Sequence, residues 1–381
     1  MKILALTSIR SDYDLLSPLY DLLNKDKDID FQLLVSGAHL SKEFGYTKKQ
    51  IVEDGFNILI EIETLINSDT AKSRLKTASL LLQNSIDIID SFKPDLLLYA
   101  GDREDVIIGS LISIYLSIPS IHFYGGDHES DGHQDTYIRH ATSKLSSLHF
   151  VSNKEHLNRL VSLGESKERI FDIGSISLDR LYNYSEVNIT NALDTKIPNN
   201  FALMIFHPIA GEDSKKIFES ILKILEERNI FTIVSYPNSD PGYEEVNQII
   251  SKNINNKNFY FYKNLSRDIF LTIFHNCSFI IGNSSAGIYE AATVKKFAIN
   301  VGLRQKNRLF NDNIIYCDSK KIEINKSIDK VLSKDSSLIL EKITNPYGNG
   351  DSSKKAYHLI KTLNLDNFII KDEDPLLNNI K

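Results

Sequence analysis

Three aspartates occupy places in the sequence where carboxylates can carry acid–base chemistry. Asp102 follows an apolar run at 96–100, Asp127 follows a second run at 120–124, and Asp135 comes shortly after it. Carboxylates that lie close together shift one another's pKa, so that one can act as an acid while another acts as a base. The alternative for Asp102 is an ordinary helix cap. Clustered carboxylates such as these suit acid–base chemistry near neutral pH.

The stretch from His122 to Asp135 is dense in side chains that can do chemistry. Three glycines interrupt it, and glycine lets the backbone approach a ligand closely. A divalent metal site is a competing use of such residues, but the chain has no HExxH or comparable spacing, and a solvated loop is the third alternative. We predict no metal and no cofactor. The other acidic and histidine side chains after Asp127 in this stretch are His128, Glu129, Asp131 and His133.

A second group of residues suits a phosphate or a nucleotide. Ser284, Ser285 and Gly287 lie between an apolar run and a helical pattern, where hydroxyl and free N–H groups can meet an anion. Glu290, about one turn further on, can accept hydrogen bonds from a ribose diol. The alternative for this segment is a well-capped helix with an exposed glutamate.

Four further residues follow apolar runs and are candidates for ligand binding. Arg10 lies where a helix starts and can pair with a phosphate, although it can also be merely exposed. His207 ends the first apolar run of the second half, but a lone histidine is more often structural. Asn238 suits either a ligand or a type I turn. Arg304 offers another guanidinium, which can equally form a surface salt bridge.

The elements that must position these residues alternate along the chain. Short apolar runs and longer amphipathic stretches follow one another, which is typical of α/β folds with parallel sheets. In such sheets, ligands bind beyond the carboxyl ends of the strands. Strands are expected at 2–7, 30–36, 96–100, 120–124, 149–151, 201–206, 231–236, 259–262, 279–282 and 297–301. Helices are expected at 12–23, 71–92, 103–116, 139–145, 154–163, 215–228, 243–252, 267–276, 286–294 and 353–363.

The alternation restarts near residue 201, so we expect two Rossmann-like domains with a ligand cleft between them. Residues 182–200 are the expected linker, because they are rich in Asn and Thr and carry no sustained apolar period. The first domain, 1–190, should hold the catalytic carboxylates, and the second, 191–355, should bind the nucleotide. Residues 356–381 are expected to form a tail that packs back on the first domain.

Composition excludes several classes of protein. Forty-four basic and fifty acidic side chains give a formal charge of -6, so there is no global positive field for nucleic acid or an anionic membrane. Two cysteines are too few for a disulfide framework or a structural zinc site. The apolar run at the start is shorter than the apolar region of a signal peptide, and no run approaches the length of a membrane span. We expect a cytoplasmic protein that binds neither nucleic acid nor membrane.

Taken together, the motifs resemble those of one enzyme family. In chain order they are SxRSDY, GDRxD, HxxGGD followed by DxxxRHA, FHP, YPNSD, NSSxGIxEA and GxRQxxR, over about residues 1–360. This set resembles the hydrolysing UDP-N-acetylglucosamine 2-epimerases of bacterial sialic acid synthesis and the similar enzymes of the legionaminic acid route. One motif departs from the family, which usually reads HxHGGE where this chain has Asp127.

The resemblance implies a glycosyltransferase-B-like fold, a homodimer or homotetramer, and no metal or cofactor. The implied reaction converts UDP-N-acetylglucosamine and water into N-acetylmannosamine and UDP, by anti elimination to a 2-acetamidoglycal and then hydration. The implied catalytic carboxylates are Asp102, Asp127 and Asp135, with His207 beside the diphosphate. The implied nucleotide-binding residues are Arg10, Asn238, Ser284, Ser285, Gly287, Glu290 and Arg304.

Other functions remain open from the sequence alone. The same reaction on UDP-2,4-diacetamido-2,4,6-trideoxyglucose, a non-hydrolysing epimerase and a glycosyltransferase are all compatible with the fold. A nucleotide-sugar sensor would need the nucleotide site without the carboxylates. The three matched aspartates argue against the transferase and the sensor.

Overall fold

The structure is a computed structural model that describes residues 1–66, 68, 70–128, 134–182, 184–209, 211–238, 240–305, 308–333 and 336–374. The chain divides into two compact units. The first contains Met1–His128, Gln134–Asp179 and the residues from Tyr347 onward, and the second contains Arg180–Pro346. None of the helices in the described ranges is both long and apolar enough to span a bilayer.

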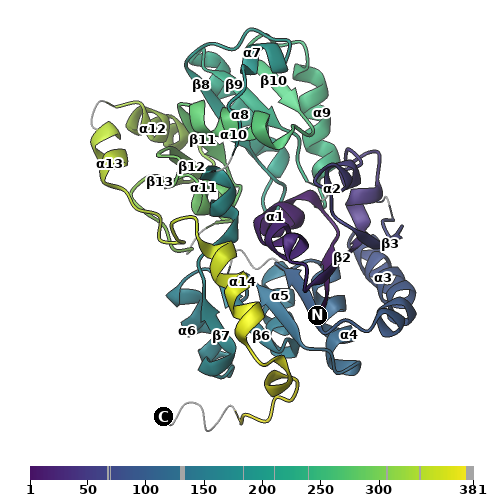
Figure 1. Cartoon of the computed structure of the whole chain (residues 1–381). Coiled ribbons are helices and arrows are strands. Elements are labelled where there is room, and N and C mark those ends of the chain that lie inside the picture. Colours follow the sequence, from purple (N-terminus) through teal and green to yellow (C-terminus); the bar gives the residue numbers. More distant parts are fainter. Residues whose placement is uncertain are drawn as a thin grey trace. The chain divides into compact units, whose positions relative to one another are not determined.

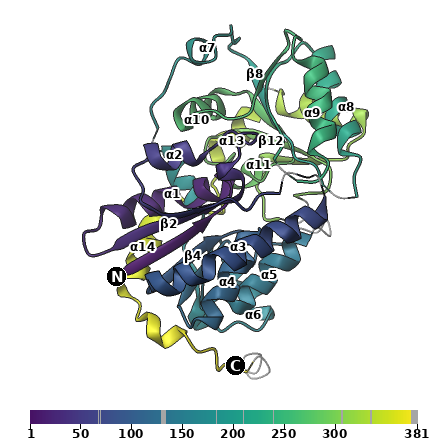
Figure 2. The ribbon, with the colours of Figure 1, turned by 90° about the vertical axis from the view of Figure 1, so that its right-hand side faces the viewer.

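The first unit is built on a seven-stranded parallel sheet in the order β3-β2-β1-β4-β5-β6-β7. Its strands are β1 (Lys2–Thr7), β2 (Asp30–Ser36), β3 (Ile58–Ile62), β4 (Leu96–Ala100), β5 (Ser120–Phe123), β6 (Leu148–Val151) and β7 (Ile170–Asp172). Its helices are α1 (Arg10–Lys25), α2 (Lys48–Glu53), α3 (Ala71–Phe92), α4 (Glu104–Tyr115), α5 (Gln134–Leu145), α6 (Lys154–Ser162) and α14 (Ser352–Thr362). Helices α3, α4 and α5 pack side by side (Figure 2). Every residue of β4 is buried, as expected for a strand covered on both faces.

The second unit repeats this plan with a six-stranded parallel sheet in the order β10-β9-β8-β11-β12-β13. Its strands are β8 (Phe201–Ile205), β9 (Phe231–Ser235), β10 (Phe259–Tyr262), β11 (Phe279–Gly282), β12 (Phe297–Val301) and β13 (Ile314–Cys317). Its helices are α7 (Ile189–Ala192), α8 (Ser214–Glu227), α9 (Tyr243–Asn253), α10 (Arg267–Asn276), α11 (Ala286–Tyr289), α12 (Lys321–Val331) and α13 (Ser336–Lys342). Apolar side chains of the sheet, α8, α9 and α12 form its core.

The prediction of two Rossmann-like α/β domains is confirmed, and most predicted elements are present. Strands β3, β7 and β13 were not predicted, and α11 ends at Tyr289 rather than at residue 294. The predicted strand 120–124 ends one residue early, because Tyr124 has φ 63 and turns the chain out of the sheet.

The division between the units differs from the expected boundaries near residues 190 and 355. The chain enters the second unit between Asp179 and Arg180 and leaves it between Pro346 and Tyr347. The expected linker belongs to the second unit because Tyr184 stacks on His275 at 4.7 Å between ring centroids. Helix α14 lies beside α1 in the first unit (Figure 1).

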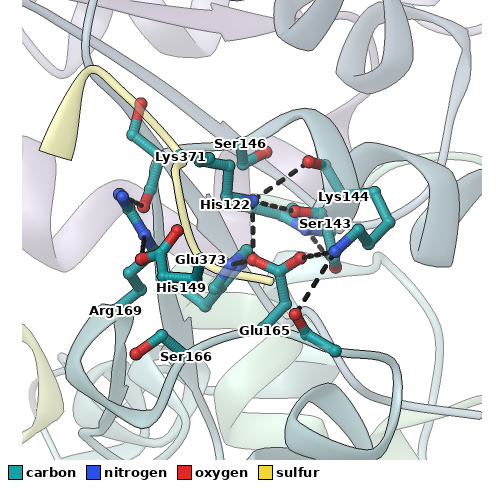
Figure 3. Close-up of polar contacts among 12 residues, drawn as sticks. His122, Ser143, Lys144, Ser146, His149, Glu165, Ser166, Arg169, Lys371 and Glu373 are labelled. Atoms are coloured by element: carbon teal, nitrogen blue, oxygen red, sulfur yellow. Dashed lines mark hydrogen bonds and ion pairs between the residues drawn. The ribbon is translucent and has the colours of Figure 1, made fainter. Parts of the chain in front are cut away.

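The residues after α14 cover a buried charge network of the first unit (Figure 3). Glu165 is 1% exposed, and its carboxylate lies 2.8 Å from His149 Nε2, 2.7 Å from Lys144 Nζ and 2.6 Å from Lys371 Nζ. Lys371 Nζ also donates to the main-chain oxygens of Ser143 and Lys144, at the end of α5. The tail therefore holds the end of the helix that carries Asp135.

The ionisation states in this network follow from its contacts. Burial alone would raise the pKa of Glu165, but the hydrogen bond from His149 and the ammonium of Lys371 outweigh it and lower the pKa to about 2. Burial lowers the pKa of His149. His149 Nδ1 has no hydrogen-bond partner among the described residues, which suits a neutral ring that donates through Nε2. Glu165 is therefore the anion of the network.

Replacing Lys371→Met should lower the free energy of unfolding by about 2 kcal/mol, because Glu165 loses a charged hydrogen-bond donor. Since its folded pKa of about 2 lies below the ordinary 4.5, the stabilisation is present above pH 4.5 and is lost as the pH falls toward 2. Urea unfolding followed by circular dichroism measures this, because the chain has no tryptophan. The exposed Lys354→Met on α14 is the control. Equal destabilisation at pH 7 and pH 3 would contradict the assignment.

Candidate functional site

The predicted residues of the first unit gather at the carboxyl ends of its central strands. Arg10 begins the helix after β1, Asp102 follows β4, and Asp127 follows β5. Strand order reverses at β1, whose neighbours are β2 and β4. Ligands of open α/β sheets bind at such a switch point.

A buried guanidinium lies between two of the three aspartates. Arg139 Nη2 pairs with Asp102 Oδ2, and Arg139 Nη1 lies 3.8 Å from Asp127 Oδ2. The same Nη1 donates to the main-chain oxygen of Tyr124 at 3.1 Å. Arg139 is 5% exposed and Asp127 is 2% exposed, so the charges interact with little screening. The structure thus brings Asp102 and Asp127 to one shared cation.

Asp135 is held by a different cation on the same unit. Its Oδ1 lies 3.1 Å from Arg74 Nη2, and Arg74 Nε pairs with Glu104. The sequence drew no attention to Arg74, because it falls on the amphipathic pattern of α3 with no motif around it. Asp135 and Arg139 both lie on helix α5, so this helix connects the Arg74–Asp135 pair with the Arg139–Asp102 pair.

The turn that presents Asp127 requires glycine. Gly126 has φ 80, and a Cβ there would lie 2.3 Å from the main-chain oxygen of His156. Asp127 Oδ1 accepts from the N–H of His128 at 2.9 Å and lies 3.4 Å from His156 Nε2. Asp127, which stands where the family usually has glutamate, is therefore oriented by the N–H of His128 and by the ring of His156. Glu129, Asp131 and His133 lie outside the described residues.

Two histidines near the carboxylates are neutral at pH 7. Burial lowers the pKa of His140 to about 4, and the neighbouring His128 and Arg139 lower it further. Burial likewise lowers the pKa of His122 to about 3. His122 Nε2 lies 2.8 Å from the main-chain oxygen of Gly101, so Nε2 carries the proton and Nδ1 accepts from Ser143 Oγ at 3.0 Å. His122 thereby ties the Asp102 turn to α5.

The segment that carries Arg10 is rich in acidic residues. Arg10 Nε lies 3.4 Å from Asp14 Oδ2 one turn along the same helix. Ser8 Oγ donates to Asp105 Oδ1 at 2.8 Å, and burial raises the pKa of Asp105 to about 6. Burial also raises the pKa of Asp12. Arg10 is thus half-buried and paired with Asp14 rather than merely exposed.

His207 of the second unit is held by main-chain and amide groups. Its backbone N–H and C=O bond to the side chain of Asn283, both at 2.8 Å. The N–H of Asn238 donates to His207 Nδ1 at 3.2 Å. Nδ1 is thus the acceptor, and the proton of the neutral ring belongs on Nε2. His207 can then donate to a ligand through Nε2.

The side chains of Asn238 and Arg304 contact Asp240. Asn238 Nδ2 donates to Asp240 Oδ2 at 2.6 Å, and Arg304 Nη2 lies 3.9 Å from the same oxygen. Asn238 Oδ1 also accepts from the N–H of Asp240 at 3.3 Å. The Asn238 side chain is therefore engaged within its own turn, which agrees with the turn alternative for this residue.

The segment after β11 carries Ser284, Ser285, Gly287 and Glu290. Ser284 Oγ accepts from the N–H of Ala286 at 3.3 Å. Gly287 packs close to β12, where a Cβ would lie 3.2 Å from that of Ala298. Glu290 is 4% exposed, so the alternative of an exposed glutamate is wrong for this residue.

Within the described ranges, no group of three or more His, Cys, Asp or Glu residues is placed so that it could hold a metal ion.

The sequence profile of the family described as UDP-N-acetylglucosamine 2-epimerase matches residues 21–361. The chain belongs to this epimerase family. It is 33% identical to the UDP-N,N'-diacetylbacillosamine 2-epimerase (hydrolyzing) of Legionella pneumophila, over 97% of this chain and 98% of the relative. It is 34% identical to the GDP/UDP-N,N'-diacetylbacillosamine 2-epimerase (hydrolyzing) of Campylobacter jejuni, over 88% of each chain. A UDP-N-acetylglucosamine 2-epimerase of Neisseria meningitidis is 31% identical, over 87% of this chain and 88% of that one.

Solved structures of the epimerase family share the fold. The UDP-GlcNAc 2-epimerase from Neisseria meningitidis bound to UDP-GlcNAc superposes with a TM-score of 0.80 at 18% identity, covering 95% of this chain and 100% of that one. The Methanocaldococcus jannaschii UDP-GlcNAc 2-epimerase in complex with UDP-GlcNAc and UDP gives a TM-score of 0.79 at 20% identity, covering 95% of this chain and 99% of that one. Both similarities establish the architecture of the present chain.

Replacing Arg139→Met should lower the epimerase kcat by at least about 100-fold, a loss typical of removing positioned acid–base or electrostatic groups. Without the guanidinium, the pKa of the neighbouring carboxyls should rise, so the acid limb of the pH–rate profile should move to higher pH. The surface variant Arg228→Met, which removes a pair with Asp329, is the control. An unshifted profile with full activity would show that Arg139 is not part of the site.

Proposed function

We propose that this epimerase is of the hydrolysing type and converts a UDP-linked 2-acetamido sugar and water into UDP and the free 2-epimer. The observation that carries the proposal is the arrangement of Asp102 and Asp127 around Arg139, with Asp135 on the same helix as Arg139. A sugar carbon next to the anomeric centre is a weak acid. Its deprotonation needs a positioned base together with a departing anion.

The first step of the proposed reaction is an anti elimination. A carboxylate of the first unit removes the proton from C2, the C1–O bond breaks, and its electrons leave with UDP. A double bond forms between C1 and C2, giving a 2-acetamidoglycal. Arg139 stabilises the ionised form of the neighbouring aspartates and so keeps a base available at neutral pH.

The second step returns the elements of water with inverted configuration at C2. Water attacks C1 through its oxygen and loses a proton to a carboxylate, while a carboxylic acid delivers a proton to C2 from the face opposite to the original one. Two carboxyl groups with opposite protonation states are therefore needed. Asp102, Asp127 and Asp135 supply these groups in the proposal.

The second unit is proposed to bind the leaving diphosphate. His207 can donate through Nε2. Ser284 and Ser285, which follow the Asn283 that bonds to the His207 backbone, offer hydroxyl groups. Arg10 of the first unit is proposed to add a positive charge. Each such donor aimed at the growing negative charge is worth about 3 to 4 kcal/mol in other enzymes.

The sugar is proposed to be UDP-N,N'-diacetylbacillosamine, a 2,4-diacetamido-2,4,6-trideoxyglucose, because the Legionella and Campylobacter relatives carry that name at 33% and 34% identity. UDP-N-acetylglucosamine is the second candidate, favoured by the Neisseria relative at 31% identity. The free 2-epimer released from either UDP-sugar is a suitable precursor of a nonulosonic, sialic-type acid. A homodimer or homotetramer is part of the proposal and can be measured by light scattering.

Proton NMR in D2O tests the reaction with each UDP-sugar, in the presence of EDTA. We expect free UDP and a free sugar that has the inverted configuration and deuterium at C2. Turnover of the preferred UDP-sugar should exceed that of the other by at least about tenfold, since a pocket built for a polar group discriminates strongly against its absence.

Other outcomes of the same experiment point to other enzymes. A UDP-linked 2-epimer without free sugar would indicate a non-hydrolysing epimerase. Turnover only after an acceptor is added would indicate a glycosyltransferase. If neither UDP-sugar releases UDP or exchanges its C2 proton, the hydrolysing proposal is wrong.

A further inference from the structure

A buried ion pair supports Glu290 in the second unit. Arg180 Nη2 lies 3.0 Å from Glu290 Oε1, and the two side chains are 13% and 5% exposed. The N–H of Glu290 bonds to the main-chain oxygen of Ala286 at 3.0 Å, so the backbone of Glu290 is fixed by α11 and its carboxylate is oriented by Arg180. No sequence motif singled out Arg180.

Arg180 is itself held firmly by the residues on either side. The carboxylate of Asp179 accepts from the N–H groups of Ser352 and Ser353, at 3.2 and 2.6 Å, at the start of α14. The main-chain oxygen of Leu181 lies 3.1 Å from His275 Nε2. An arginine with a restrained backbone and a planar, rigid guanidinium can fix the direction of a carboxylate better than a flexible lysine.

The chemistry of the pair suggests what it prepares Glu290 to do. A carboxylate has two oxygens and can accept several hydrogen bonds, so an arginine on Oε1 leaves the group able to accept from a ligand hydroxyl. Leaving a buried carboxylate without its cation is strongly unfavourable, and the side chain would then become protonated or turn away. The pair therefore keeps Glu290 ionised and in one orientation.

We propose that Arg180 is a positioning residue that holds Glu290 in the orientation for accepting hydrogen bonds from the ribose hydroxyls of a uridine nucleotide. The inference rests on the proposed function, because it takes the ligand to be a UDP-sugar. It predicts that Arg180 governs recognition of the ribose and leaves the other nucleotide contacts unchanged.

Calorimetric titration of the full chain with UDP and with 2'-deoxy-UDP tests this inference. The unmodified protein should bind UDP at least about tenfold more tightly, because a hydrogen bond to a charged acceptor is lost with the 2'-hydroxyl. Arg180→Met should reduce this preference to below about threefold while changing the affinity for 2'-deoxy-UDP by less than about threefold. Arg180→Lys should give an intermediate preference.

Two further variants make the test specific. Glu290→Gln should lower the preference as Arg180→Met does, and the double variant should lose no more than either one, since the two residues act as a unit. Arg228→Met on the surface of the same unit should keep the full preference. Circular dichroism shows whether each variant is folded, and Arg180→Lys carries the test if Arg180→Met is not.

The outcomes separate this inference from the proposed function. If the unmodified protein binds neither nucleotide, the proposed function fails. If it binds UDP and 2'-deoxy-UDP equally, Glu290 does not accept a hydrogen bond from the 2'-hydroxyl and the inference is wrong. If Arg180→Met or Arg180→Lys keeps the full preference, or weakens both nucleotides equally, Arg180 has only a structural role and the inference is overturned.

Discussion

The shared interaction of Asp102 and Asp127 with Arg139 is the constraint around which the first unit is arranged. Two carboxylates that are mostly out of water repel each other strongly unless a cation lies between them. Arg139 can lie between Asp102 and Asp127 only if α5 places its guanidinium near the carboxyl ends of β4 and β5. The turn at Gly126, the main-chain oxygen of Tyr124 and the buried ring of His122 all serve that placement.

In the second unit, hydrogen bonds from uncharged groups position the side chain of His207. Its central histidine, His207, is oriented by the N–H of Asn238 and by the amide of Asn283 rather than by charges. Main-chain groups cannot change rotamer, so they fix a tautomer at little entropic expense. In the first unit Arg139 holds Asp102 and Asp127 by charge, while in the second a main-chain N–H orients the ring of His207 and an ion pair with Arg180 orients Glu290.

Much of this architecture could be predicted from the sequence, and the failures have physical causes. Runs such as Leu96–Ala100 are entirely apolar because helices cover both faces, and they were easy to locate. The strand Ile58–Ile62 lies at the sheet edge with most of its residues partly exposed, so its pattern is weak. Asp102 and Asp127 follow strands within recognisable motifs. Arg74 and Arg180 act through partners distant in sequence, which no local pattern reveals.

The network around Glu165 has a consequence for how the protein is made. Arg169 bonds to the main-chain oxygens of Phe368 and Ile370, and Lys371 bonds to Glu165, so the first unit is closed by residues near the end of the chain. During synthesis, this unit must wait with Glu165 uncovered until the whole second unit has left the ribosome. The two units therefore cannot mature in the order in which they are translated, as independent domains usually do.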